Sequence, residues 1–143
     1  FDPQPGEMTC RPEAVRKQKD LIEKLHETGA EVLISSHVLH FLPADEVLEI
    51  ALSQQERGAD IVKIVTGASS MDEQLENLRI THLLKKELKV PFLFLSGGQC
   101  ELHRRIGPIL GCCMYLCSLD DTVEPGPVQP MLRKVKAIRD NWT

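Results

Sequence analysis

The sequence has few aromatic residues, and its net charge is not positive. Among 143 residues there are only four Phe, one Tyr and one Trp, and the formal net charge is −4 at pH 7. No stretch combines clustered basic residues with interleaved aromatic ones. Surfaces that bind nucleic acid need both features, and anionic membranes need the basic charge, so we expect neither partner.

Long apolar runs are also absent. No run approaches the roughly 18 apolar residues of a membrane-spanning helix, and the first residues do not follow the pattern of a signal peptide. Hydrophobic residues make up 42% of the chain and charged residues 27%, which is typical of globular proteins. We therefore expect one domain over residues 1–143, located in the cytoplasm and long enough to bury a core.

The cysteines do not form a recognisable disulfide or metal pattern. Three of the five lie close together in one strand-like run, where they are poorly placed to bridge one another. Two of these, Cys113 and Cys117, are too close along an extended strand to resemble a zinc site. We expect reduced thiols, no metal and no bound cofactor.

Apolar periodicity and turn residues predict helices that alternate with short buried strands. The expected helices cover residues 13–28, 43–57, 71–88, 100–110 and 131–141, and the expected strands lie within residues 31–36, 58–65, 91–96 and 111–117. Short connections between them predict an α/β protein with a parallel sheet of about four strands and right-handed crossovers. Such a sheet is either small and open or half of a TIM-type (βα)8 barrel. The barrel is favoured because polar residues follow successive strands, on the face where these barrels carry their active sites.

Lys63 lies in the middle of a strand that is apolar on both faces, Ile61-Val62-Lys63-Ile64-Val65. A lysine is rarely fully buried without a partner. Lys63 therefore either reaches solvent at the end of the strand or is desolvated, which lowers the pKa of an amine and is typical of Schiff-base lysines. His37 ends the preceding strand, and a neutral imidazole is suited to moving protons near pH 7.

Three stretches together resemble the type I 3-dehydroquinate dehydratase family. They are Ser35 to Pro43, Gly58 to Ile64, and Arg104 to Gly111. The interval of 26 residues from His37 to Lys63 also fits the family. The resemblance covers nearly the whole chain, but it matches only the carboxyl-terminal half of the family's barrel.

The resemblance implies a role for each candidate residue. Lys63 would form a Schiff base with the ketone of 3-dehydroquinate, and His37 would act as general base and then as acid. Arg104 would hold the substrate carboxylate, for which a guanidinium is well shaped. Gln129 and Ser35 are further candidates for substrate binding.

Two features depart from the family pattern, and a third leaves its alignment open. Family members carry a Ser-Ala-Pro-Gly-Gln run on a lid, whereas here Val123 and Pro127 replace the serine and the glutamine. The family's first four strands, which supply a glutamate and an arginine to the pocket, have no counterpart in this sequence. A shift of one residue would also nominate Arg105 in place of Arg104, although the following glycines fit Arg104 better.

The function implied by the resemblance is dehydration of 3-dehydroquinate to 3-dehydroshikimate in the shikimate or quinate pathway. The altered lid leaves open a catalytically impaired relative that binds a ligand or a protein. A different (βα)8 lyase or aldolase that uses Lys63 on another keto acid is a third possibility. Because a half-barrel exposes sheet edges and apolar faces, we expect a homo-oligomer or pairing with an amino-terminal half.

Overall fold

The computed structural model describes residues 8–98, 101–119 and 129–142. Its elements follow one another in the order α1 (Pro12–Glu27), β1 (Leu33–His37), α2 (Ala44–Glu56), β2 (Ile61–Thr66), α3 (Met71–Glu87), β3 (Phe92–Ser96), α4 (Glu101–Leu110) and α5 (Leu132–Asp140). These elements confirm five helices and three of the four expected strands. No helix in the described ranges is long and apolar enough to cross a membrane.

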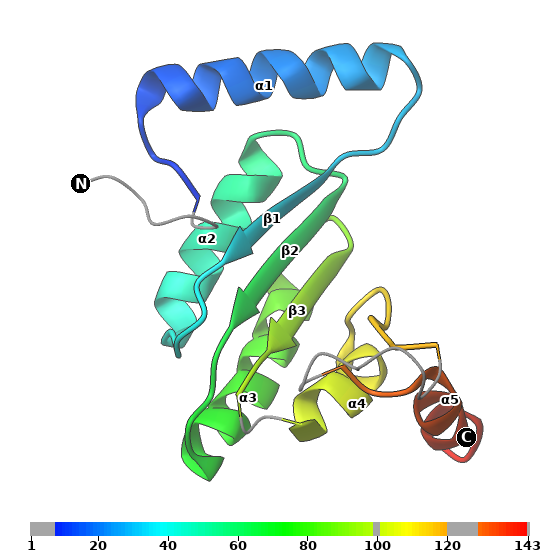
Figure 1. Ribbon diagram of the computed structural model, residues 1–143. Coiled ribbons are helices and arrows are strands. Elements are labelled where there is room, and N and C mark those ends of the chain that lie inside the picture. The colour runs from blue at the N-terminus through cyan, green and yellow to red at the C-terminus, as the bar shows by residue number, and fades with distance from the viewer. Residues whose placement is uncertain (1–7, 99–100, 120–128, 143) are drawn as a thin grey trace.

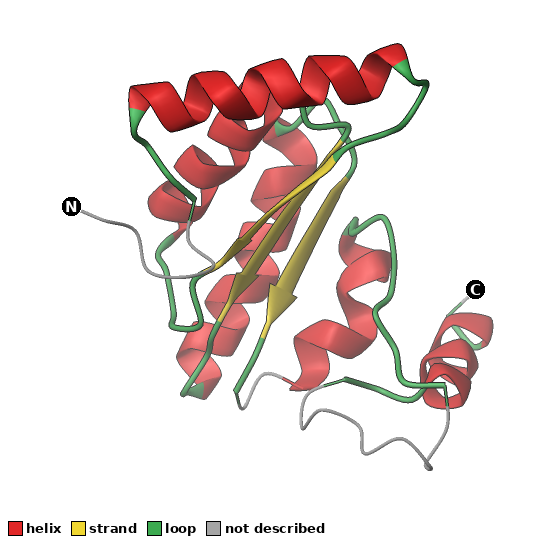
Figure 2. Cartoon of the chain, turned by 45° about the horizontal axis from the view of Figure 1, so that its top comes forward, coloured by secondary structure: helices red, strands yellow, loops and turns green. Residues whose placement is uncertain are grey.

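The three strands form one parallel sheet in the order β1-β2-β3. Helices α2 and α3 lie together against one face of this sheet (Figures 1 and 2). Val62, Ile64 and Phe94 on that face are each 1% exposed and belong to the main hydrophobic core. The parallel α/β class is therefore confirmed, and its core lies between the sheet and these two helices.

The opposite face of the sheet is not covered by any helix of the described chain (Figure 1). On β1, exposed and buried residues alternate, so Leu33, Ser35 and His37 face outward on this open face. On β3 all five residues are buried. Met114 and Leu116 pack against the core and line the same small pocket as the leucines of β3, which accounts for part of this burial.

The fourth strand, expected over residues 111–117, does not form. The segment lies beside β3 with one backbone hydrogen bond, from Cys113 N–H to the Phe92 carbonyl at 2.8 Å. At Ser118 the chain instead makes an isolated parallel bridge to Met131. A single hydrogen bond to β3 does not make a strand ladder. The backbone N–H and carbonyl of Ser118 are instead hydrogen-bonded to Pro130 and Leu132, in the segment that leads into α5.

The connection between β2 and α3 is fixed by two local features that shape the carboxyl-terminal edge. A Cβ on Gly67 would lie 2.9 Å from the Leu39 carbonyl oxygen, so only glycine allows this close approach to the loop after β1. Ser70 then caps α3 by accepting a hydrogen bond from Glu73 N–H at 3.2 Å. The Glu73 carboxylate accepts one in return from Ser69 N–H at 2.6 Å.

Candidate active site

His37 and Lys63 contact each other on the open face of the sheet. His37 Nε2 lies 3.1 Å from Lys63 Nζ. The strand register explains the contact, because Lys63 pairs with Ser35 and His37 pairs with Val65. All four side chains therefore project from the same face, and the long lysine side chain extends along it to the imidazole. The two residues that sequence reasoning nominated for catalysis are brought together.

The surroundings of His37 favour its neutral form. The pKa of His37 is lowered from its usual value, first by partial burial and then by the positive charges of Lys63 and Arg104. Near pH 7 the imidazole is therefore unprotonated and able to accept a proton, as a general base must be.

Arg104 approaches the same edge from α4. Its Nε donates a hydrogen bond to the carbonyl oxygen of Ser96, the last residue of β3, at 2.7 Å. The adjacent Arg105 instead forms a salt bridge to Glu101 within α4 at 3.0 Å. Arg104 acts on the pKa of His37, whereas no such effect of Arg105 is found. This placement supports Arg104 over the alternative alignment.

The other predicted binding residues lie on β1 and just before α5. Ser35 is exposed and lies in the same row of the sheet as Lys63. Gln129 is exposed just before the Ser118–Met131 bridge. Val123 and Pro127 of the altered lid lie outside the described residues. Binding by Ser35 and Gln129 stays a prediction.

As a lone histidine in a helical stretch, His103 resembles a surface residue in the sequence, but the structure does not place it at the surface. It is fully buried between α3 and β3, with its ring packed edge-on against Phe94 at a centroid distance of 5.2 Å. Burial, with a smaller contribution from the charge of Arg104, lowers the pKa of His103 to about 4. One sequence signal could have indicated this: Gly107 and Leu110 share its helix face and make that face small and apolar.

Among the described residues, no three His, Cys, Asp or Glu side chains are clustered as a metal site requires. The side chains that the structure does bring to this edge carry an amine, an imidazole and a guanidinium.

Comparison with known proteins identifies the family of this sequence. The sequence model described as "Type I 3-dehydroquinase" matches residues 7–140. A 3-dehydroquinate dehydratase of Alkaliphilus oremlandii is 34% identical over 115 residues, which cover 76% of this chain and 45% of that protein. One from Clostridium kluyveri is 32% identical over 120 residues, covering 82% of this chain and 46% of the relative. The chain thus spans a little under half the length of these relatives.

Solved structures agree on the fold. A type I 3-dehydroquinate dehydratase from Clostridium difficile superposes with a TM-score of 0.79 at 19% identity, over 88% of this chain and 50% of that one. A 3-dehydroquinate dehydratase from Geobacillus kaustophilus gives a TM-score of 0.78 at 21% identity, over 87% and 48%. At this identity the likeness concerns the fold, which corresponds to part of a (βα)8 barrel. Family membership is shown by the sequence: because the family model matches residues 7–140, this chain belongs to the type I 3-dehydroquinase family.

Proposed function

We propose that this chain supplies the Schiff-base chemistry for the dehydration of 3-dehydroquinate to 3-dehydroshikimate. The observation that carries the proposal is the 3.1 Å approach of His37 Nε2 to Lys63 Nζ at the carboxyl ends of neighbouring strands. The names of the relatives support the choice of substrate. Imine-based elimination needs an amine and a proton-accepting imidazole close enough to reach adjacent carbons of the same substrate ring.

The reaction follows from the two side chains. The Lys63 amine attacks the C3 ketone, and loss of water gives a protonated imine. The imine withdraws electrons and acidifies C2, so His37 can remove a C2 proton to give an enamine. The enamine then expels the C1 hydroxyl, which leaves as water with the proton from His37. Hydrolysis of the conjugated imine frees the product and regenerates Lys63, so that the net change is loss of one water.

The remaining candidates bind and orient the substrate. In the proposal Arg104 holds the substrate carboxylate, because its guanidinium is anchored at the end of β3 and its charge already reaches His37. Ser35 lies in the Lys63 row and is proposed to contact a substrate hydroxyl. Gln129 is proposed as a donor in place of the family's lid glutamine.

Reduction by borohydride tests the proposal directly. In the presence of 3-dehydroquinate, the reductant should fix the ligand to Lys63, and mass spectrometry of peptides should find the added mass there. Lys63→Ala should abolish the adduct. Lys86→Ala, which changes an exposed lysine of α3, should leave the adduct intact. An unmodified Lys63 in the unaltered chain would count against the proposal.

We also propose that residues 1–143 are a single domain equivalent to the carboxyl-terminal half of the family barrel, completed by an amino-terminal half. β1 is an end strand of the described sheet, and Leu33 on its open face is 40% exposed. The chain also covers only 45% of its Alkaliphilus oremlandii relative. A half-barrel segment that added to β1 would cover this face and close the pocket.

The occupant can be tested by mixing. The chain and a separately produced amino-terminal half of the Alkaliphilus oremlandii relative should co-elute at the summed mass in light scattering. A dimer of this chain alone would identify a second copy as the occupant in place of that half. A chain that stays a folded monomer after the amino-terminal half is added would overturn the pairing proposal.

A second candidate is a catalytically impaired relative that binds the same ligand. The open face around His37 favours it, because a site exposed on one side excludes water poorly. This candidate predicts ligand binding in calorimetry with no rise in product absorbance, even after the amino-terminal half is added. Turnover that is lost in Lys63→Ala would rule it out.

A further inference from the structure

A chain of buried polar side chains lies on the helix-covered side of the sheet, directly behind the candidate site. Its members come from α3, β3 and α4, and each is 0% exposed: Asn77, Thr81, Ser96 and His103. Burying a polar group lowers the stability of the fold unless the group is hydrogen-bonded, so the partners of these four side chains show what holds them in place.

Asn77 joins the ends of two strands. Its side-chain Nδ2 donates to the Ser96 hydroxyl at 2.6 Å and to the Gly67 carbonyl at 3.2 Å. Ser96 is the last residue of β3, and Gly67 directly follows β2. One amide on α3 thus holds the carboxyl-terminal ends of β2 and β3 at a fixed separation.

Ser96 connects Asn77 to Arg104. The Ser96 hydroxyl accepts the bond from Asn77 at 2.6 Å, and its carbonyl oxygen accepts the bond from Arg104 Nε at 2.7 Å. The carbonyl that orients the guanidinium therefore belongs to a residue whose side chain is fixed from behind. A shift of Ser96 would move the acceptor that aims Arg104.

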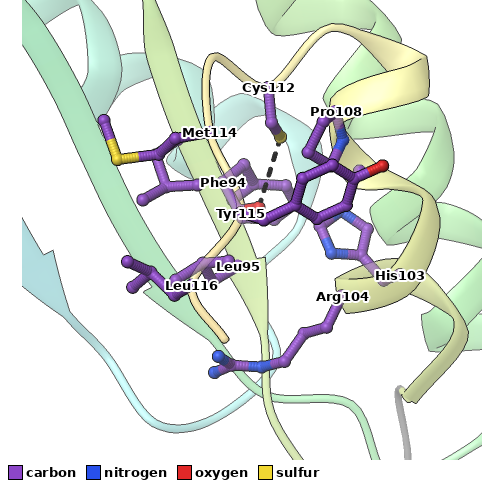
Figure 3. Close-up of a pocket in the computed structure, with 11 residues that line it drawn as sticks. Phe94, Leu95, His103, Arg104, Pro108, Cys112, Met114, Tyr115 and Leu116 are labelled. Atoms are coloured by element: carbon purple, nitrogen blue, oxygen red, sulfur yellow. Dashed lines mark hydrogen bonds between the residues drawn. The ribbon is translucent and has the colours of Figure 1, made fainter. Parts of the chain in front are cut away.

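His103 fixes the helix that carries Arg104. The Thr81 hydroxyl donates its only hydrogen to the Asn77 carbonyl at 2.8 Å, so it accepts a hydrogen bond from His103 Nε2 at 2.7 Å. This network assigns a neutral imidazole with its proton on Nε2. Figure 3 shows the His103 ring turned toward Phe94 and the Arg104 guanidinium pointing away from it. α4 is thereby held against α3 while Arg104 is left to extend toward the site.

From this geometry we infer that Asn77 is a positioning residue for Arg104 and acts through Ser96. The inference rests on the proposed role of Arg104 in holding a carboxylate. Asn77 itself contacts no substrate, and its effect is to fix the direction in which the guanidinium is presented. In a site of this kind, a small displacement of a binding group weakens productive binding.

Hydrogen exchange at Arg104 Nε–H, measured by nitrogen-15 NMR on this chain, tests the inference without requiring turnover. Asn77→Leu should speed the exchange about tenfold or more, as expected when a hydrogen bond to a charged group is weakened. Ser96→Ala should act in the same direction, because it removes the hydroxyl but keeps the carbonyl that Arg104 uses. If Asn77→Leu does not fold, Ser96→Ala decides alone.

The matched control is Gln74→Leu, one turn earlier on the same helix. Gln74 is also buried, at 6% exposed, but its amide donates to Met71 Sδ rather than to Ser96. This variant should leave the Arg104 exchange rate unchanged. Unchanged exchange in folded Asn77→Leu and Ser96→Ala would overturn the inference.

A second readout separates positioning from general loosening. Because the charges of Lys63 and Arg104 lower the pKa of His37, displacing Arg104 should raise that pKa in an NMR titration. Asn77→Leu should raise the His37 pKa when it is the only substitution. In a chain that already carries Arg104→Gln, adding Asn77→Leu should raise the His37 pKa no further. An equal rise in both backgrounds would overturn the inference. Loss of imine trapping at Lys63, by contrast, would refute the proposed function and leave these NMR results standing.

Discussion

β1 and β3 pair with opposite edges of the same strand, yet β1 is exposed at every second residue and β3 is buried at all five. The inner side of β3 packs against α3 and α4, and the inner residues of β1, Ile34 and Ser36, are buried as well. They differ on the other side, where residues 112–118 cover β3 and nothing in the described chain covers β1. One side of this small sheet is therefore accessible along β1, and the same side is packed along β3.

Two histidines show what the separation does. His37, at the open end of β1, contacts Lys63 and keeps a partly exposed ring that can exchange protons. His103, beneath β3, is fully buried and bonded to Thr81. Burial lowers the pKa of both, and the charge of Arg104 adds a smaller contribution in each case. The open side thus holds the reactive groups, and the covered side holds the groups that fix them in place.

The largest expected effect comes from the open side. His37→Gln removes the proposed base, so the rate of deuterium exchange at C2 of bound 3-dehydroquinate should fall by about 10²–10⁴-fold. Stability should hardly change, because His37 is exposed. The exchange can be followed by mass spectrometry of the recovered ligand. His40→Gln, a change to an exposed histidine in the following loop, should keep the original rate, and an equal loss there would contradict the assignment.

The next effect comes from the covered side. Phe94→Ala empties a site that is 1% exposed and should lower the free energy of unfolding by about 3–5 kcal/mol. Leu33→Ala, at a β1 position that is 40% exposed, should cost about 1 kcal/mol or less. Urea denaturation followed by circular dichroism gives both values. Similar losses at the two positions would mean that β1 is as well packed as β3.

A smaller effect is expected on lowering the pH. The pKa of His103 is about 4 in the folded chain against an ordinary value of 6.5, so between these values the unfolded chain binds more protons. Stability present above about pH 6.5 should therefore be lost as the pH falls, by an amount on the order of 3 kcal/mol at pH 4.

The control for this pH dependence is a pair of variants studied by urea denaturation at each pH. His103→Gln should flatten the curve between pH 7 and pH 4. His26→Gln, which changes a histidine whose side chain is 40% exposed, should leave most of the fall in place. If His103→Gln shows the same decline as the unaltered chain, another group is responsible.

The sequence allowed the open side to be predicted better than the covered side. The strands ending at His37 and containing Lys63 are short apolar runs bounded by turn residues, and strand-end residues meet at one edge of a parallel sheet. Their contact thus follows from local pattern and topology. The pattern of residues 111–117 was equally strand-like, but a strand also needs a pairing edge, and Ser118 is bonded to the segment before α5 instead.

The residues behind the site could not be found in the same way. His103 resembles a surface helix residue in the sequence. Its burial depends on contacts with Thr81 of α3 and Phe94 of β3, which the local sequence of α4 does not show. Asn77 carries no motif, and its importance comes from two acceptors that the fold brings together. Local periodicity holds no information about such contacts.

The close approach at Gly67 has a consequence for any segment that joins the free edge of β1. The Gly67 N–H donates to the His40 carbonyl at 2.9 Å, so the backbone leaving β1 rests directly on the backbone leaving β2. With no side chain between them to absorb movement, a twist imposed on the outer strand is carried into its neighbour. A segment that paired with β1 would therefore change the distance between the His37 imidazole and the Lys63 amine without contacting either side chain.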